Sequence, residues 1–277
     1  MKKTRFIVKL FVALALFLAV PVPVAADILI LPIRTVFKDR ERMKNIAVVN
    51  KSDKAATFRM SLFYQEQTAD GSYKKLDGPL NPAADFSKMM TFSPRQVSLP
   101  AYGKQAIRLA LRRPADLPEG EYRVHLRLQR LDGDQKVGLT GKNGKGVSLQ
   151  MGINVGFAVP IILRHGKYDS AATISDPVFT RASADGKTLP KVEFTINRTG
   201  KYSTLGKVEV FWTPLSGGEE KKVGILNNAN VFPELTKRSM KVSLNDKTIS
   251  GGTLRIVYDG DDADAGLHFD EKSFPIR

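Results

Sequence analysis

The sequence predicts an all-β protein built from two β-sandwich domains in tandem. Segments such as Thr57–Tyr64 and Tyr122–Leu128 alternate apolar and polar residues with a period of two, the pattern of a strand with one buried face. Clusters such as LPEGE and LDGD separate these segments and supply the backbone angles that turns require. No long segment has a convincing helical period. Regularly spaced short strands therefore indicate sandwiches or barrels.

The first 26 residues are expected to be a cleavable secretory signal. Four cations precede an apolar stretch, Leu10–Val20, and the small residues Val24 and Ala26 suit signal peptidase. Cleavage is then expected before Asp27. The apolar run is shorter than the ~20 residues that span a bilayer, so we expect export as a soluble chain without membrane insertion.

Composition limits the kinds of partner. The chain has 277 residues and no cysteine, so an exported protein of this sequence must hold its core without disulfides. Its formal net charge is +15, of which the expected signal contributes +4, leaving a basic mature chain of +11. Nucleic acid is not an expected partner, because the Lys and Arg residues are spread along the chain and export separates it from nucleic acid.

The domain boundary is expected near Pro160. Pro160 cannot donate a hydrogen bond to a sheet, and Gly166 loosens the chain soon after it. The first domain is then residues 27–160 and the second is residues 161–277. Further alternating segments predict strands in the second domain: Ala172–Val178, Lys191–Asn197, Lys207–Trp212, Met240–Leu244, Gly252–Tyr258 and Phe274–Arg277.

One segment before the boundary is unusually long and regular. In VSLQMGINVGFAV, every second residue is apolar, and these residues are Val147, Leu149, Met151, Ile153, Val155, Phe157 and Val159. Extended, it would reach roughly 44 Å, whereas typical strands have ~5–6 residues. An ordinary core strand remains an alternative. A Gly-, Lys- and Asp-rich loop precedes the segment, however, and a long apolar edge would aggregate unless a partner covered it. Strand addition to a partner's open sheet accounts for both features.

The first domain resembles the periplasmic chaperones of the chaperone–usher pathway, which assembles pili and fimbriae. The resemblance rests on ILPIRTVF, IAVVNKSD, FSPRQVSLPAYGKQAIRLALRRP, LPEGEYRVHLRL and the long alternating strand, in that order. It implies two immunoglobulin-like β-sandwiches and a donor strand that fills the groove left by a pilin's missing strand. The implied partners are pilus or fimbrial subunits and an outer-membrane usher, with no cofactor. Free chaperone could also self-associate through the donor strand.

The resemblance further implies basic residues that anchor the subunit's C-terminal carboxylate. Arg34, in the PIRTVF-like first strand, corresponds to one anchoring position, and Arg offers a fork that matches both carboxylate oxygens. Typical members carry a second cation, a Lys in the long strand. Ala158 stands there in this chain, which indicates a divergent branch. Arg123 is the expected replacement, with His125 and Arg127 on the same strand face as further candidates. A solvated strand face is the alternative for these three residues.

Enzymatic chemistry is not expected. His125, His165 and His268 lie far apart without metal-ligand spacing, and no nucleophile elbow or phosphate-binding loop occurs. The run DGDDADAG could offer oxygen ligands to calcium, but it lacks the EF-hand spacing, and a solvated hairpin tip is the favoured interpretation. The alternative function is a secreted polysaccharide- or cell-wall-binding sandwich protein. That function would need an exposed aromatic platform, whereas Trp212, the single tryptophan, lies in a predicted strand. A fibre subunit is less favoured because the donor-like strand is internal.

Overall fold

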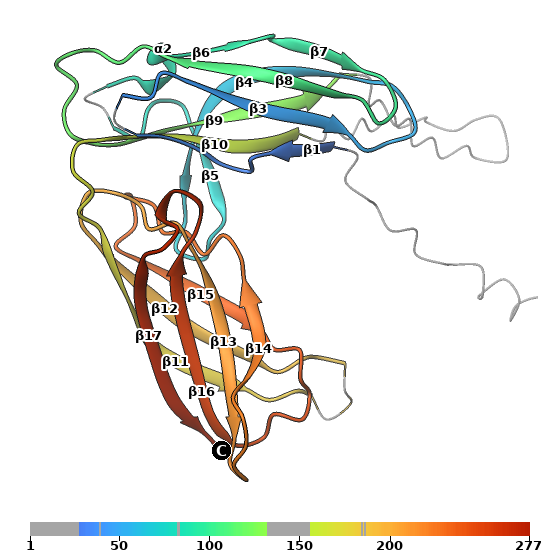
Figure 1. The fold of residues 1–277 in the computed structure, drawn as a ribbon, viewed down its shortest axis with the longest axis vertical. Coiled ribbons are helices and arrows are strands. Elements are labelled where there is room, and N and C mark those ends of the chain that lie inside the picture. Colours follow the sequence, from blue (N-terminus) through green and yellow to red (C-terminus); the bar gives the residue numbers. More distant parts are fainter. Residues whose placement is uncertain (1–27, 39, 82–83, 132–155, 184, 186) are drawn as a thin grey trace, which may run out of the picture.

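The computed structural model describes residues 28–38, 40–81, 84–131, 156–183, 185 and 187–277. The expected signal peptide lies outside the described residues. Five of the predicted donor-strand residues also lie outside them: Val147, Leu149, Met151, Ile153 and Val155. The described chain forms two β-sandwiches that meet at an angle (Figure 1).

The first sandwich consists of two sheets and one short helix. One sheet has the order β1 (Ile28–Leu31), β3 (Met43–Asn50), β8 (Lys104–Leu111), β6 (Met90–Ser93). The other has the order β2 (Thr35–Lys38), β10 (Gly156–His165), β9 (Gly120–Arg130), β4 (Ala56–Gln67), β5 (Tyr73–Leu76), and β7 (Gln96–Leu99) also pairs with β4. Helix α2 (Phe86–Met89) precedes β6.

The period-two pattern of the sequence explains which faces become the core of this sandwich. On β9, Tyr122, Val124, Leu126 and Leu128 are buried in one cluster with side chains from the opposite sheet, such as Ile46. Burial of apolar area of this kind is the main favourable term in folding. The alternate residues of β9 point to the outer face of the sheet, where the candidate anchors lie.

The second sandwich repeats this plan with fewer strands. One sheet has the order β11 (Ala171–Thr180), β12 (Lys191–Thr199), β15 (Lys237–Ser243). The other has the order β14 (Lys221–Leu226), β13 (Gly206–Pro214), β16 (Gly252–Gly260), β17 (His268–Ile276), with the short 3-10 helix η1 (Asp262–Asp264) between the last two. Strand β12 places Val192, Phe194 and Ile196 in the core between the sheets. The predicted all-β fold of two immunoglobulin-like sandwiches in tandem is confirmed.

The boundary between the sandwiches lies later than the sequence predicts. Strand β10 continues through Pro160 to His165 and pairs along that whole length with β9, so residues 161–165 belong to the first sandwich. Pro160 fits here because pairing with β2 begins only at the next residue, Ile161, and strands accept proline where one side is unpaired. The change from one sandwich to the other therefore follows His165.

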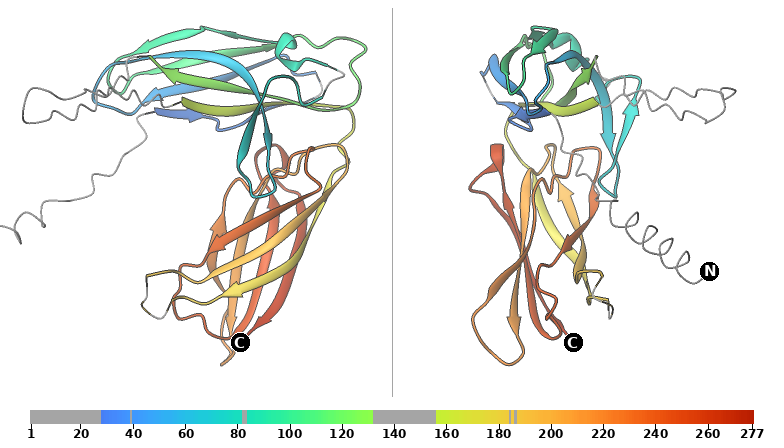
Figure 2. Two further views of the ribbon diagram at one scale, coloured as in Figure 1. Left: turned by 180° about the vertical axis from the view of Figure 1, so that it is seen from behind. Right: turned by 90° about the vertical axis from the view of Figure 1, so that its right-hand side faces the viewer.

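Three kinds of contact hold the sandwiches together. Val36 and Ile162 of the first sandwich pack with Leu205 and Phe232 of the second in a small buried cluster. The β4–β5 hairpin reaches down to the second sandwich (Figure 2), where the carbonyl of Ala69 accepts a hydrogen bond from the Ser239 amide at 2.9 Å. Ion pairs, described below, form the third kind.

Candidate strand-donation edge and cleft arginines

Strand β10 has an open edge next to the predicted donor strand. Residues Gly156–His165 all pair with β9, but β2 pairs with β10 only from Ile161 to Arg164. Among the described residues, no strand pairs with residues 156–160 on the side away from β9. Unpaired backbone groups in an extended strand are a template for pairing with another chain. This edge is continuous in sequence with residues 147–155.

The two described apolar residues of the alternating row, Phe157 and Val159, face the core of the first sandwich. Val159 is buried in that core and Phe157 is half-buried against it. Ala158, between them, is exposed on the outer face and lies opposite Arg127 of β9. Ala158, which stands where typical members of the resembled family carry a Lys, supplies no cation there. The outer face gains its positive charge from β9 instead.

Strand β1 adds exposed apolar side chains at the edge of the other sheet. Leu29 and Leu31 on β1 and Ile33 just after it are all exposed, while Ile28 and Ile30 point into the core. Between β1 and β2 the chain crosses from one sheet to the other, because β1 pairs with β3 and β2 pairs with β10. An apolar row on a sandwich edge is the kind of surface that a protein partner covers.

Arg34 lies where the open part of β10 meets β2. It directly precedes Thr35, which pairs with Ile161 at the first paired position of the β2 ladder. The residue is only 3% exposed, and its Nε donates to Oδ2 of Asp262 at 3.2 Å. Asp262 belongs to the second sandwich, and its side chain is 43% exposed. Arg34 makes no other ion pair with a described residue, so its terminal nitrogens remain for another acceptor.

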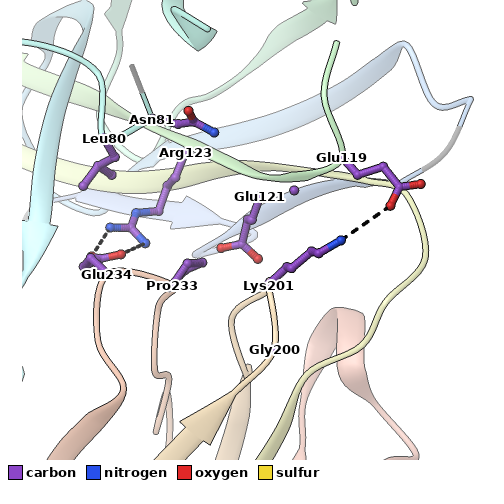
Figure 3. A pocket seen from close by; sticks show the side chains of 10 residues that line it. Leu80, Asn81, Glu119, Glu121, Arg123, Gly200, Lys201, Pro233 and Glu234 are labelled. Atoms are coloured by element: carbon purple, nitrogen blue, oxygen red, sulfur yellow. Dashed lines mark hydrogen bonds and ion pairs between the residues drawn. The ribbon is translucent and has the colours of Figure 1, made fainter. Parts of the chain in front are cut away.

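Arg123 is buried and already holds a carboxylate (Figure 3). Its two terminal nitrogens contact the two oxygens of Glu234 in the second sandwich, one at 3.2 Å and one closer. The guanidinium also lies 3.8 Å from the centre of the Phe232 ring, a cation–π contact. Glu234 is 17% exposed and also accepts the amide hydrogen of Gln67 at 2.7 Å. The solvated face that was the alternative for Arg123 is wrong, because the second sandwich covers it.

His125 and Arg127 differ sharply although they share one strand face. His125 is 1% exposed beside Phe63 and Tyr73, and no described residue hydrogen-bonds its Nδ1. Burial, and then the charge of Arg123, lower the pKa of His125 to about 3, so the ring is neutral near pH 7 and supplies no cation. Arg127 is exposed over Phe63 and makes no ion pair with any described residue. Among the described residues of β9, it is an accessible cation beside the open edge.

A buried polar network of the interface, around Arg164, was not predicted from the sequence. Arg164 on β10 contacts both oxygens of Asp264 in η1, and its Nε donates to Glu121 of β9 at 3.3 Å. Glu121 in turn accepts from the amide of Ser203 at 3.0 Å. The favoured interpretation of DGDDADAG as a solvated tip is wrong for Asp264, which is 3% exposed. A pairing across 100 residues leaves no local pattern in the sequence.

A cavity of about 420 Å³ lies between the sandwiches beside Arg123. Figure 3 shows the side chains that enclose it, which come from both sandwiches. On the first side these include Glu119 and Glu121, and on the second side Lys201 and Glu234. Lys201 lies 3.9 Å from Glu119, a loose surface pair. The cavity thus mixes both signs of charge.

The described residues hold no group of three or more His, Cys, Asp or Glu side chains placed to bind a metal ion. His268 contacts a single carboxylate, that of Asp259, at 2.8 Å on the surface. None of the helices in the described ranges has the length and apolar character needed to cross a membrane.

Comparison with known proteins gives structural likenesses of low sequence identity. No protein-family model and no curated sequence matches the chain. Among solved structures, a chain of a chaperone–tip adhesin complex of CFA/I fimbriae is 16% identical, with a TM-score of 0.44, covering 91% of this chain and 99% of that chain. The class 5 fimbriae chaperone CfaA is 14% identical, with a TM-score of 0.41 and coverage of 90% and 99%.

A third likeness is to a chain of the Salmonella enterica SafA pilin–SafB chaperone complex. It is 12% identical, with a TM-score of 0.41, and the match covers 92% of this chain and 99% of that chain. Each of these three structures contains a pilus or fimbria chaperone, the class of protein that the sequence motifs resemble.

Proposed function

We propose that the protein is a periplasmic chaperone that binds pilus or fimbrial subunits by donating a β-strand, and that it then delivers them to an outer-membrane usher. The observation that carries the proposal is that no described strand pairs with residues 156–160 of β10 on the side away from β9. The alternating row from Val147 to Phe157 runs directly into this edge. A subunit lacking a strand would gain backbone hydrogen bonds from the edge, and its groove would take the apolar side chains.

The position of Arg34 supports a carboxylate anchor. A subunit strand that paired with residues 156–160 would lie in line with β2, because both would occupy the same side of β10. Its end would meet the chain just before Thr35, where Arg34 is buried with both terminal nitrogens unused by described residues. A terminal carboxylate there would receive charge-assisted hydrogen bonds, which are stronger than neutral ones. It would thus fix the register of the added strand.

The other candidate anchors contribute differently to the proposal. Arg123 is held by Glu234, and His125 is neutral, so neither offers a spare positive charge. Arg127 is exposed beside Ala158 and adds a cation along the open edge. It is therefore the second cation that we propose in place of the missing Lys. The same edge would let free chaperone molecules pair with one another.

The alternative, a polysaccharide-binding sandwich, lacks its expected platform in the described residues. Trp212 is buried on β13, and its ring nitrogen donates to the carbonyl of Gly251 at 2.9 Å. Export through the signal expected in residues 1–26 would bring the mature chain to the periplasm. No catalytic role and no cofactor form part of the proposal.

The test is capture of a subunit in the periplasm. The mature chain is co-expressed there with the subunits encoded beside it and pulled down, as wild type and as Arg34→Ala and Ile153→Asp. Matched controls are Arg108→Ala, which removes an exposed arginine from the opposite sheet, and Asn154→Asp, which adds the same charge one residue along. We expect a one-to-one complex that Arg34→Ala and Ile153→Asp weaken and that both controls leave intact.

Two other outcomes would change or overturn the proposal. Weakening by Ile153→Asp alone would leave strand donation standing and would place the anchor at another cation, with Arg127→Ala as the next variant. A folded wild type that captures no subunit would overturn the chaperone proposal, and polysaccharides would then be screened.

A further inference from the structure

The two buried arginines that the resemblance marks as anchors, Arg34 and Arg123, each hold a carboxylate from the second sandwich, but the two pairs differ in strength. Glu234 meets both terminal nitrogens of Arg123, is 17% exposed and accepts a second hydrogen bond from the Gln67 amide. Asp262 meets only Nε of Arg34, and its side chain is 43% exposed. Two-point contacts of arginine with a carboxylate are the stronger ones, and exposure weakens an ion pair further. Asp262 is thus the more easily displaced of the two carboxylates.

The backbone around Asp262 is fixed independently of its contact with Arg34. Asp262 has a φ of 55°, in the left-handed region that Asp and Asn tolerate, and the Asp261 side chain accepts its amide hydrogen at 2.7 Å. Two residues on, Asp264 is locked onto Arg164 and also accepts from the Leu205 amide at 2.9 Å. The side chain of Asp262 can therefore leave Arg34 while η1 keeps its place.

We propose that Asp262 is a built-in substitute for the subunit's terminal carboxylate, which occupies Arg34 in the free chaperone and is displaced when a subunit binds. This inference rests on the proposed chaperone function. The physical advantage concerns the buried charge of Arg34. An unpaired buried cation is strongly unfavourable, whereas exchange of one carboxylate for another keeps the charge compensated before and after binding. The incoming carboxylate would engage the terminal nitrogens that Asp262 leaves unused.

The exchange has a consequence for affinity and for selectivity. A site that its own protein occupies for part of the time binds with an affinity reduced by the fraction that is free. Asp262 would therefore weaken every subunit complex moderately. Only a ligand with a free carboxylate would form an ion pair with Arg34 that compensates for the loss of the Asp262 contact. A subunit end without that charge would leave Asp262 in place.

Asp262→Asn is the decisive variant, because Asn keeps the shape and the tolerance of positive φ but removes the charge. Its matched control is Glu271→Gln, which changes the net charge equally at an exposed residue paired with Arg255. The probe is a synthetic peptide that copies the carboxyl-terminal strand of the captured subunit, prepared both as the free acid and as the terminal amide. Dissociation constants are measured by calorimetry for the mature chain and each variant.

We expect Asp262→Asn to bind the free acid about two- to fivefold more tightly than wild type, the range for a single-point ion pair with one exposed partner. The amide should bind Asp262→Asn and wild type alike, and Glu271→Gln should match wild type with both peptides. With Arg34→Ala as background, the gain from Asp262→Asn should vanish. Asp262→Gly, which also fits the backbone, should reproduce the gain and guards against an effect peculiar to Asn.

Glu234→Gln serves as the contrasting variant at the other arginine. Because Glu234 is held by three hydrogen bonds, its loss should lower the midpoint of thermal unfolding without tightening peptide binding. Equal binding of the free acid by Asp262→Asn and Glu271→Gln would overturn the inference, as would weaker binding by Asp262→Asn. Either result would leave the chaperone proposal intact so long as Ile153→Asp still weakens capture of the subunit.

Discussion

Arg164 of the first sandwich holds Asp264 of the second through both of its terminal nitrogens, in a pair that water scarcely reaches. The side chains of Arg164 and Asp264 are 5% and 2% exposed. Arg164 ends the ladder between β10 and β2, and Asp264 ends η1, so the pair joins the donor-strand sheet to the turn that carries Asp262. The geometry of the proposed anchor therefore depends on this contact.

Removing the charge of Asp264 should loosen the two sandwiches. Asp264→Asn leaves a buried guanidinium without its main partner, and breaking a buried pair costs about 3 kcal/mol. We expect a corresponding fall in the free energy of unfolding in urea, together with a less compact molecule in small-angle X-ray scattering. Asp185→Asn, which breaks an exposed pair with Lys187, should change neither quantity. Equal stability of the two variants would show that the interface does not depend on Arg164.

The buried ring of His125 should make stability depend on pH. Burial and the neighbouring Arg123 lower its pKa from 6.5 to about 3, so the unfolded chain binds a proton in this window while the folded chain does not. Stability from this group is therefore complete above pH 6.5 and is lost as the pH falls toward about 3. The slope should be at most about 1.4 kcal/mol per pH unit, measured by urea unfolding across the window.

His125→Phe keeps an aromatic ring that cannot take a proton, so this part of the slope should disappear in that variant. His268→Phe is the control, because His268 is on the surface beside Asp259. A slope that survives in His125→Phe would assign the pH dependence to other groups.

A methyl group at Gly260 should disturb the turn that presents Asp262 to Arg34 and Asp264 to Arg164. A Cβ at Gly260 would overlap the carbonyl oxygen of Asp264. We expect Gly260→Ala to cost about 1–3 kcal/mol, as overpacking usually does, and to weaken subunit capture with it. Gly251→Ala adds the same methyl where the nearest neighbouring atom is 3.8 Å away and should be harmless by both measures. Wild-type stability in Gly260→Ala would mean that the backbone of the turn can shift to accommodate the methyl group without loss of folding free energy.

The sequence alone predicted the fold class and most of the strands. Alternation in segments such as Lys191–Asn197 is a local property, because successive side chains of a strand point to opposite faces whatever the partner strand is. The resemblance also placed Arg34 among the candidate anchors, and the structure locates it at the end of the open edge. The boundary at Pro160 was misplaced because a proline is compatible with a strand wherever one side lacks a partner.

Periodicity could not decide what covers the outer face of β9. Arg123, His125 and Arg127 share that face in the sequence pattern. In the structure, the second sandwich covers Arg123, aromatic side chains bury His125, and Arg127 stays exposed. The partners of the cleft arginines lie 111 residues away for Arg123 and 228 for Arg34. Period-two alternation specifies a face but not its neighbour. Only the tertiary packing determined that Arg34 and Arg123 are paired with carboxylates, that His125 is uncharged near pH 7 and that Arg127 is exposed.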